Sequence, residues 1–221
     1  MTAHDFGNPK ASLVLIQPVD DHDLSAMARE EAAIRERTDA DFHLIAVRMD
    51  RWLHDLSPWR APAVFGREDF GDGAGDTLAE ILERWHDPAK TYCIGGYSLA
   101  GLFSLWASYQ TDAFSGVAAA SPSLWFPGFQ TYMDAHGTRS RAVYLSLGDR
   151  EEKTRNPVLA TAGDCIRKGY ETLEKQGISC ILEWNEGNHF REPELRMAKA
   201  FAWAIRAVKE RKGGNDGIHN D

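Results

Sequence analysis

Short apolar runs alternate with amphipathic segments along most of the chain. Apolar runs of strand length occupy residues 12–19, 42–49, 91–98, 114–123, 142–149 and 178–187. Segments with helical spacing or composition lie between and after them, at 24–38, 76–86, 99–110, 158–175 and 192–209. Strands joined through helices must run mostly parallel, with helices on both faces of the sheet. The pattern therefore predicts a three-layer α/β fold with a mostly parallel central sheet.

The same pattern shows no repeat, low-complexity block or linker that divides the chain. We therefore predict one domain over residues 1–209. Residues 210–221 are polar and rich in glycine, which predicts a disordered tail. Residues 50–75 are dense in proline, glycine and aromatic residues and form a long loop, a feature that is usually functional.

Composition and charge narrow the class of protein. The 221 residues carry 25 Lys+Arg against 33 Asp+Glu, a formal net charge of −8. That balance argues against a nucleic-acid partner, because phosphate binding needs a concentrated basic face. No apolar run approaches the roughly 18 residues that cross a bilayer, and residues 1–10 lack the features of a secretion signal. We therefore expect a cytoplasmic protein with no membrane partner.

Cysteines and clustered acidic residues often mark metal sites, but neither has the spacing of a metal site in this sequence. The three cysteines, Cys93, Cys165 and Cys180, contain no CxxC pair, which favours reduced thiols over a disulfide framework or a zinc site. The acidic run at residues 20–23, DDHD, lacks the spacing that aims four ligands at one centre. A loop that caps a helix explains that run better. We therefore expect no metal and no cofactor.

The most informative stretch is IGGYSLAG, residues 94–101. A buried strand ends at Ser98, and an apolar helix begins there with almost no turn between them. So sharp a turn needs small residues two before and two after the serine, and these are Gly96 and Ala100. The stretch fits the G-x-S-x-[GA] turn that lifts a nucleophilic serine above a sheet. The alternative is a glycine-rich strand end in which Ser98 only caps the helix.

A nucleophilic serine needs a base to take its proton and a third group to orient that base. His189 follows the last predicted strand and is the histidine that comes after a strand C-terminal to the candidate acids. Asp149, Glu151 and Glu152 are those candidates, and all three lie in the loop after the preceding strand. We choose Glu151, because its place three residues past Gly148 leaves the loop room to reverse towards the histidine.

These motifs resemble the α/β-hydrolase superfamily, and more narrowly the esterase family that includes esterase D and the siderophore esterases. The resemblance covers residues 12–208 and rests on GGYSLAG, AAASPSLWF, LGDREE and GNHF. It implies a serine hydrolase of esters or thioesters, with the acid of a Gly-x-x-acid loop falling on Glu151. There are two departures. The opening antiparallel strands of the full fold are missing from the pattern, and Asn188 precedes the histidine where Gly or Glu is commoner.

Acyl transfer also needs donors for the negative charge that develops on the carbonyl oxygen. The amide of Leu99, directly after the serine at a helix N-terminus, is the first expected donor. The second should follow the first predicted strand. There Pro18 has no N–H, which leaves Val19 or Asp20, and we choose Val19.

Aromatic residues gather in the loops after strand ends, where ligands enter folds of this type. The residues expected to bind substrate are Trp59, Arg60, Phe70, Tyr97, Trp125 and Phe190. Arg60 suits a polar or anionic substrate tail. The segment 125–141 is too short for a large cap domain, so we expect an open pocket.

We therefore predict a serine esterase that cleaves a small-molecule carboxylic ester, or a thioester, through an acyl-enzyme intermediate. Two alternatives stay open. One is an acyltransferase, in which an alcohol replaces water, and the other is a binding protein that keeps the scaffold without turnover. The sequence specifies neither the acyl group nor the oligomeric state.

Overall fold

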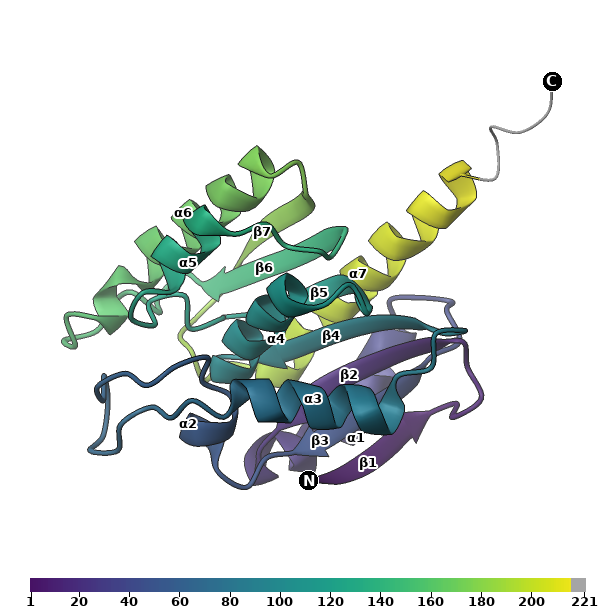
Figure 1. Ribbon diagram of the computed structural model, residues 1–221, viewed down its shortest axis with the longest axis horizontal. Coiled ribbons are helices and arrows are strands. Elements are labelled where there is room, and N and C mark those ends of the chain that lie inside the picture. The colour runs from purple at the N-terminus through teal and green to yellow at the C-terminus, as the bar shows by residue number, and fades with distance from the viewer. Residues whose placement is uncertain (216–221) are drawn as a thin grey trace.

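The computed structural model describes residues 1–215, which form a seven-stranded sheet flanked by helices (Figure 1). The strand order is β1-β3-β2-β4-β5-β6-β7. The strands are β1 (Thr2–Gly7), β2 (Leu13–Val19), β3 (His43–Arg48), β4 (Thr91–Tyr97), β5 (Phe114–Ala120), β6 (Ala142–Gly148) and β7 (Ser179–Asn185). Neighbouring strands from β3 to β7 are parallel, and β1 is antiparallel to β3.

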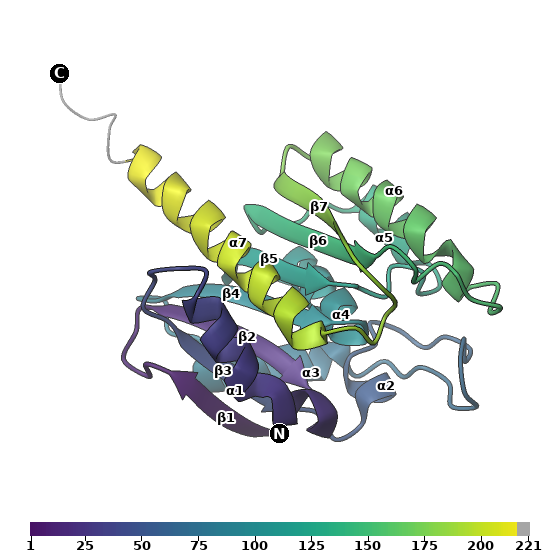
Figure 2. The same ribbon diagram turned by 180° about the vertical axis from the view of Figure 1, so that it is seen from behind.

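Helices cover both faces of this sheet. They are α1 (Asp21–Arg35), α2 (Trp52–Asp55), α3 (Ala74–Trp85), α4 (Leu99–Gln110), α5 (Phe129–Ala135), the 3-10 turn η1 (Leu159–Thr161), α6 (Ala162–Lys175) and α7 (Pro193–Asn215). Helices α1 and α7 pack on one face, and α3 to α6 pack on the other (Figures 1 and 2). The predicted three-layer α/β architecture is confirmed. Among residues 1–215, no helix combines the length and the apolar character that crossing a bilayer requires.

The central strands are buried on both faces, which explains their continuous apolar runs. In β2, Val14 and Ile16 pack in the core beneath α4, while Leu13 and Leu15 pack in the core beneath α1 and α7. Every residue of β2 is buried. Because the sheet is parallel, the loops that follow β2, β4, β6 and β7 leave it at one edge, and that edge carries the candidate active site.

An antiparallel strand does precede the first parallel unit, so the prediction that such strands are missing is wrong. Strand β1 pairs with β3 over six residues, from Thr2 opposite Arg48 to Gly7 opposite His43. It is an edge strand with exposed or half-buried side chains. Backbone hydrogen bonds to β3 define it, and such bonds leave no apolar pattern in the sequence.

Element ends also differ from the predicted ranges. Helix α7 runs to Asn215, past the predicted domain end at 209, so residues 210–215 are helical rather than part of a disordered tail. Lysine, arginine and glutamate are good helix formers at exposed positions, and the segment after Val208 begins with them. The rest of the predicted tail, 216–221, lies outside the described residues. Short helices α2 and α5 lie where loops were expected.

The acidic run at residues 20–23, which spans the N-cap and first turn of α1, has structural partners. The carboxylate of Asp20 accepts a hydrogen bond from the backbone N–H of Asp23 at 2.8 Å and so caps α1. Asp21 forms an ion pair with Arg48 of β3, with Nε 2.6 Å from the carboxylate. The predicted helix cap is therefore confirmed at Asp20, whereas residues 21–23 form the first turn of α1 and not a loop.

A polar pair is buried between β2 and α1. Gln17 and Glu30 are each 2% exposed, and Gln17 Nε2 donates to Glu30 Oε2 at 3.3 Å. Both line a small cavity between α1 and α7, together with Asp23 and Glu194. Burial raises the pKa of Glu30 well above its usual value; the hydrogen bond from Gln17 opposes this shift, and the nearby carboxylates add to it. Burial also raises the pKa of Asp23 to about 6.

We expect Glu30→Gln to stabilise the protein increasingly as the pH rises. An acid whose pKa is raised by folding keeps a proton that the unfolded chain releases near 4.5. The carboxyl of Glu30 therefore stabilises the fold at low pH, and this stabilisation is lost as the pH rises through the folded pKa. A glutamine side chain does not titrate, so its contribution to stability does not change with pH. The Tm difference between variant and wild type should grow between about pH 5 and pH 8 in thermal unfolding followed by circular dichroism.

Glu83→Gln is the matched control, because it makes the same chemical change at an exposed position on α3. Its Tm difference should stay near zero and flat across this range. A Glu30→Gln difference that is constant or falls with pH contradicts the prediction.

Candidate active site

Ser98 connects β4 to α4 through a strained backbone. Its φ of 57° and ψ of −118° are values that residues other than glycine rarely adopt. A Cβ on Gly96 would lie 2.5 Å from the carbonyl carbon of Ala100, so glycine alone fits two residues before the serine. The Ser98 amide donates to Ala120 O at 3.2 Å, and its carbonyl accepts from Ser123 N at 3.0 Å. These contacts hold the strained turn in place.

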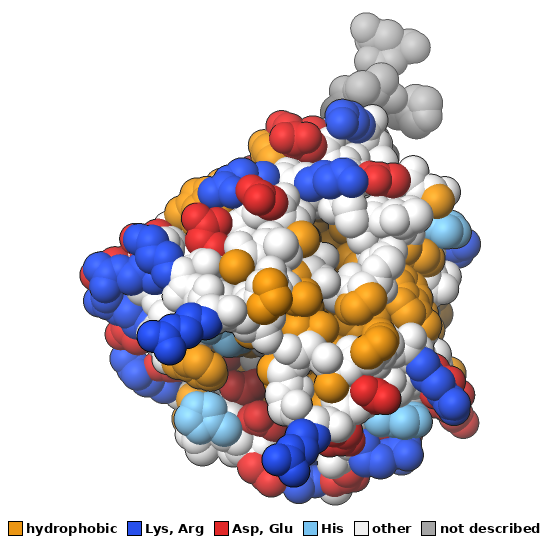
Figure 3. All heavy atoms as spheres, turned by 90° about the vertical axis from the view of Figure 1, so that its left-hand side faces the viewer, with side chains coloured by type: hydrophobic (Ala, Val, Ile, Leu, Met, Phe, Trp, Pro, Cys, Tyr) orange, Lys and Arg blue, Asp and Glu red, His pale blue; other side chains and the backbone are white. Residues whose placement is uncertain are grey.

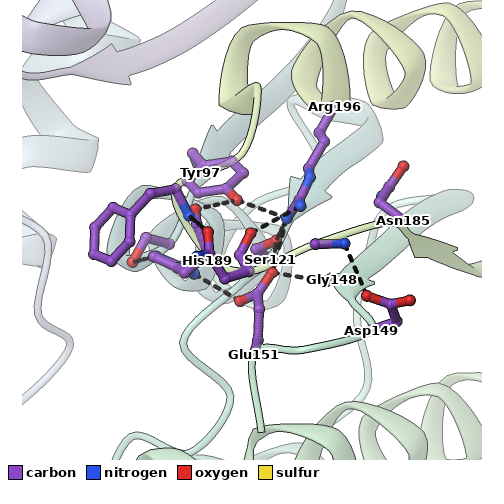
Figure 4. A network of polar contacts seen from close by, with 12 residues as sticks. Tyr97, Ser121, Gly148, Asp149, Glu151, Asn185, His189 and Arg196 are labelled. Carbon is purple, nitrogen blue, oxygen red and sulfur yellow. Dashed lines mark hydrogen bonds and ion pairs between the residues drawn. The ribbon is translucent and has the colours of Figure 1, made fainter. Parts of the chain in front are cut away.

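Three side chains meet at the carboxyl edge of the sheet (Figure 4). Nε2 of His189 lies 3.0 Å from Oγ of Ser98, and Nδ1 lies 2.6 Å from Oε2 of Glu151. Ser98 follows β4, Glu151 follows β6 and His189 follows β7. An imidazole in this position can take a proton from the hydroxyl, while the carboxylate holds its ring and its tautomer.

Glu151 is the one of the three candidate acids whose carboxylate contacts the histidine. Oδ1 of Asp149 instead accepts from the backbone N–H of Gly187 at 2.8 Å. The carboxylate of Glu152 lies 3.7 Å from a guanidinium nitrogen of Arg167. Asp149 therefore ties the acid loop to the loop of His189, and Glu152 belongs to a surface ion pair.

The carboxylate of Glu151 is buried and fully hydrogen-bonded. Its Oε1 accepts from Ser121 Oγ at 2.7 Å, from Gly148 N at 2.7 Å and from Arg196 Nη1 at 2.8 Å. Burial alone raises the pKa of this carboxyl, but the hydrogen bonds and the charge of His189 outweigh it and lower the pKa of Glu151. The group therefore stays ionised at neutral pH, as a residue that orients an imidazole must.

Solvent exposure is divided between these groups. The side chain of His189 is 32% exposed, Ser98 is half-buried, and the side chain of Glu151 is 5% exposed. A ligand can therefore reach the hydroxyl and the imidazole from solvent. It cannot reach the carboxylate.

Three predicted substrate-binding residues lie at the surface. Phe190 is 84% exposed, and its ring stands edge-on to His189 with centroids 5.5 Å apart. Trp125 is half-buried and lies 6.0 Å from the exposed ring of Phe65. The Arg60 side chain is exposed, but its Nε pairs with Asp72 at 3.0 Å, so this guanidinium already has an acidic partner. Hydrophobic side chains gather in the middle of the face at the carboxyl edge, with charged ones around them (Figure 3).

Of the other three, Phe70 and Tyr97 are buried, which corrects the prediction for these two, and Trp59 is half-buried. Phe70 is 3% exposed and belongs to the core beneath α4. Trp59 packs against the aromatic rings of α5, and its indole N–H donates to Pro127 O at 2.9 Å. Tyr97 packs on the α7 side of the sheet, where its hydroxyl donates to the backbone carbonyl of His189 at 2.7 Å. Position in a strand-end loop does not determine which way a ring points.

Sequence reasoning missed Arg196, which α7 brings to the site. This arginine is 3% exposed, and it donates to Glu151 and to the hydroxyl of Tyr97, the latter at 3.0 Å (Figure 4). A signal existed in the sequence. Arg196 stands one helical turn before Ala200 and beside Met197, and apolar residues at these positions of the predicted helix 192–209 mark the side that faces the core.

Comparisons with known proteins place the fold. No family model matches this sequence, and no curated protein matches it. The enterobactin esterase FES from Shigella flexneri matches with a TM-score of 0.61 at 16% identity, over 92% of this chain and 55% of that chain. This chain thus spans about half the length of that esterase.

Two solved structures of similar length also match. Est1E from Butyrivibrio proteoclasticus has a TM-score of 0.58 at 14% identity, over 94% of both chains. The S-formylglutathione hydrolase from Agrobacterium tumefaciens has a TM-score of 0.59 at 11% identity, over 93% of this chain and 89% of that chain. At such identities the likeness shows the fold, and this chain has the α/β-hydrolase fold of these esterases.

Proposed function

We propose that this protein is a serine esterase that cleaves a small-molecule carboxylic ester or thioester. The observation that carries the proposal is the unbroken series of contacts from Ser98 through His189 to Glu151, at 3.0 and 2.6 Å. A fold shared with esterases supports the reaction class. The proposed compartment is the cytoplasm, which suits three unpaired cysteines.

The reaction proceeds in two halves. Oγ of Ser98 attacks the carbonyl carbon while Nε2 of His189 takes the hydroxyl proton, which gives a tetrahedral oxyanion. The oxyanion collapses, the leaving alcohol takes the proton from His189, and the acyl group stays on the serine. Water then gives a proton to His189 and attacks the acyl carbon. The bond from that carbon to Oγ of Ser98 breaks, Oγ takes the proton back from His189, and the acid is released. Throughout, Glu151 orients the ring and stabilises its charged form.

The oxyanion needs two amide donors, and α4 offers the first. Leu99 begins this helix, and a helix leaves its first amides without an intrahelical acceptor. The second comes from the end of β2. The Val19 carbonyl accepts a hydrogen bond from the backbone N–H of Met49, just after β3, at 2.9 Å. The N–H and C=O of one residue in a strand point towards the same neighbouring strand, so the Val19 amide also points towards β3. The Val19 amide thus faces away from β4, so we propose the next amide, that of Asp20, in its place.

The exposed aromatic residues suggest the acyl group. Phe190 stands beside His189. Trp125 lies two residues after Ser123, whose Oγ is 3.4 Å from Oγ of Ser98, and the exposed ring of Phe65 packs against Trp125. Apolar rings bind apolar or aromatic acyl groups by excluding water. Matched structures include a ferulic acid esterase and an enterobactin esterase solved with a dihydroxybenzoyl compound. We therefore propose an aromatic or bulky apolar acyl group.

We expect Ser98→Ala to lower kcat/KM for p-nitrophenyl acetate by about 10³-fold or more, because the nucleophile is gone. Labelling by a fluorophosphonate probe should also be lost. The control is Ser104→Ala, which removes another α4 hydroxyl, one that donates to Ala100 O at 2.8 Å. It should keep both activity and labelling.

The outcomes also separate the alternatives. A near wild-type rate for Ser98→Ala contradicts the proposed nucleophile. A wild-type protein that is neither labelled nor active is the non-catalytic binding protein. Transfer of the acyl group to an added alcohol in preference to water identifies an acyltransferase.

We expect Phe190→Ala to discriminate between acyl groups. Loss of one apolar contact costs about 1–2 kcal/mol, so kcat/KM for p-nitrophenyl benzoate should fall by about tenfold. The value for the acetate should stay within about twofold, because the acetyl group is too small to reach the ring. Trp184→Ala, at another exposed aromatic residue, is the control and should change neither value. Equal losses on both esters contradict the aromatic acyl site.

A further inference from the structure

We propose that Arg196 is a positioning residue that locks the carboxylate of Glu151 and the loop of His189 into one rigid unit. The inference rests on the proposed esterase function and extends it to a residue outside the Ser-His-acid set. The role is carried by a buried guanidinium that donates to Glu151, the acid beneath the imidazole (Figure 4), and to backbone carbonyls of the loop that carries His189.

The first contact orients the acid. Nη1 of Arg196 donates to Oε1 of Glu151 at 2.8 Å, and Ser121 and Gly148 donate to the same oxygen. His189 uses the other oxygen, Oε2. With three donors on Oε1, the carboxylate cannot rotate without breaking charge-assisted hydrogen bonds, so Oε2 stays directed at the imidazole.

The second set of contacts holds the histidine loop. Nη2 of Arg196 donates to the carbonyl oxygens of Glu186 at 3.2 Å and Asn188 at 2.9 Å, within the connection from β7 to α7. Nη1 also donates to the Tyr97 hydroxyl, which in turn donates to the carbonyl of His189. Three carbonyls of this loop are therefore tied, directly or through one hydroxyl, to a single side chain.

Arginine chemistry suits this double role. A guanidinium presents its N–H donors in a fixed plane, so Nη1 and Nη2 can serve different partners at once in one geometry. A lysine ammonium keeps the charge but is a compact point charge without that fork. We therefore predict that a lysine at position 196 keeps the positive charge but holds Glu151 and the His189 loop in place less well than arginine does.

Stability alone does not account for the pair. The side chains of Arg196 and Glu151 are 4% and 5% exposed, and a buried ion pair contributes little net stability once the loss of hydration is counted. The loop it holds carries the partly exposed His189, which must stay aligned with Ser98 on one side and Glu151 on the other. Displacing a catalytic group by about 1 Å can cost about 10²-fold in rate.

The test compares Arg196→Met and Arg196→Lys with wild type, using p-nitrophenyl acetate and fluorophosphonate titration of active sites. We expect Arg196→Met to lower kcat per active site by about 10²-fold with KM within about twofold, and Arg196→Lys to recover part of that loss. Lys199→Met is the matched control. It removes another cation of α7, paired with Glu183 at 2.7 Å, and should leave kcat within about twofold.

A double-mutant cycle shows whether Arg196 acts through the acid. In the Glu151→Gln background, substitution of Arg196 should lower kcat several-fold less than in wild type, because the carboxylate it orients is gone. This double variant also removes both buried charges, so it tolerates the loss of arginine better than the single variant. Should Arg196→Met fail to fold, the cycle is run with Arg196→Lys.

Three results would each overturn the positioning role. One is an equal loss of kcat in the wild-type and Glu151→Gln backgrounds. The others are a change in KM with kcat unchanged, and a wild-type kcat in Arg196→Lys. Failure of the proposed function is a separate result. In that case wild type is not labelled and Ser98→Ala keeps its activity, whereas failure of the Arg196 inference leaves an active, labelled wild type.

Discussion

The carboxylate of Glu151 is buried beneath an imidazole that solvent can reach, and the rest of the site supplies the hydrogen bonds that this buried charge requires. A buried, unpaired carboxylate loses several kcal/mol of hydration free energy, and such a group normally takes up a proton instead. Here separate parts of the chain supply donors: Ser121 after β5, Gly148 at the end of β6, His189 after β7 and Arg196 in α7. Burial raises the pKa of Glu151, but the hydrogen bonds from His189, Ser121 and Gly148 and the charge of His189 outweigh it and lower that pKa.

The site depends on both helical layers, which contribute different things. The α4 layer supplies Ser98, the proposed nucleophile, because the close approach of Gly96 to Ala100 allows the strained turn at Ser98. The α7 layer supplies orientation through Arg196, and Tyr97 of β4 reaches the same side. Since the sheet lies between the layers, the histidine loop at its edge is where the two contributions meet. The proposed proton transfer thus joins groups that opposite faces of the sheet hold in place.

The aromatic residues of the loops divide into those that pack in the interior and those that stay exposed at the surface. Rings in the loops after β3 and β5 mostly complete the core, as Phe70 and Trp59 do. Phe190 and Phe65 remain exposed at the carboxyl edge. Apolar rings bind apolar groups by excluding water, so we propose these rings as the part of the surface most suited to an acyl group. The core ring of Phe70 supports that surface from beneath, with its centroid 5.9 Å from that of Phe65.

The sequence by itself determined the order of the parallel strands and of the longer helices between them. It also determined the turn at Ser98, and the three-acid loop and the histidine that follow later strands. Each of these depends on local composition or on the rule that parallel strands end at one edge. Tertiary structure decided what local pattern does not encode. It placed β1 through backbone pairing, turned Tyr97 and Phe70 inward, selected Glu151 from three neighbouring carboxylates and directed the Val19 amide towards β3. It also brought Arg196 to the acid, because contacts between residues 45 positions apart arise only when helix and sheet pack.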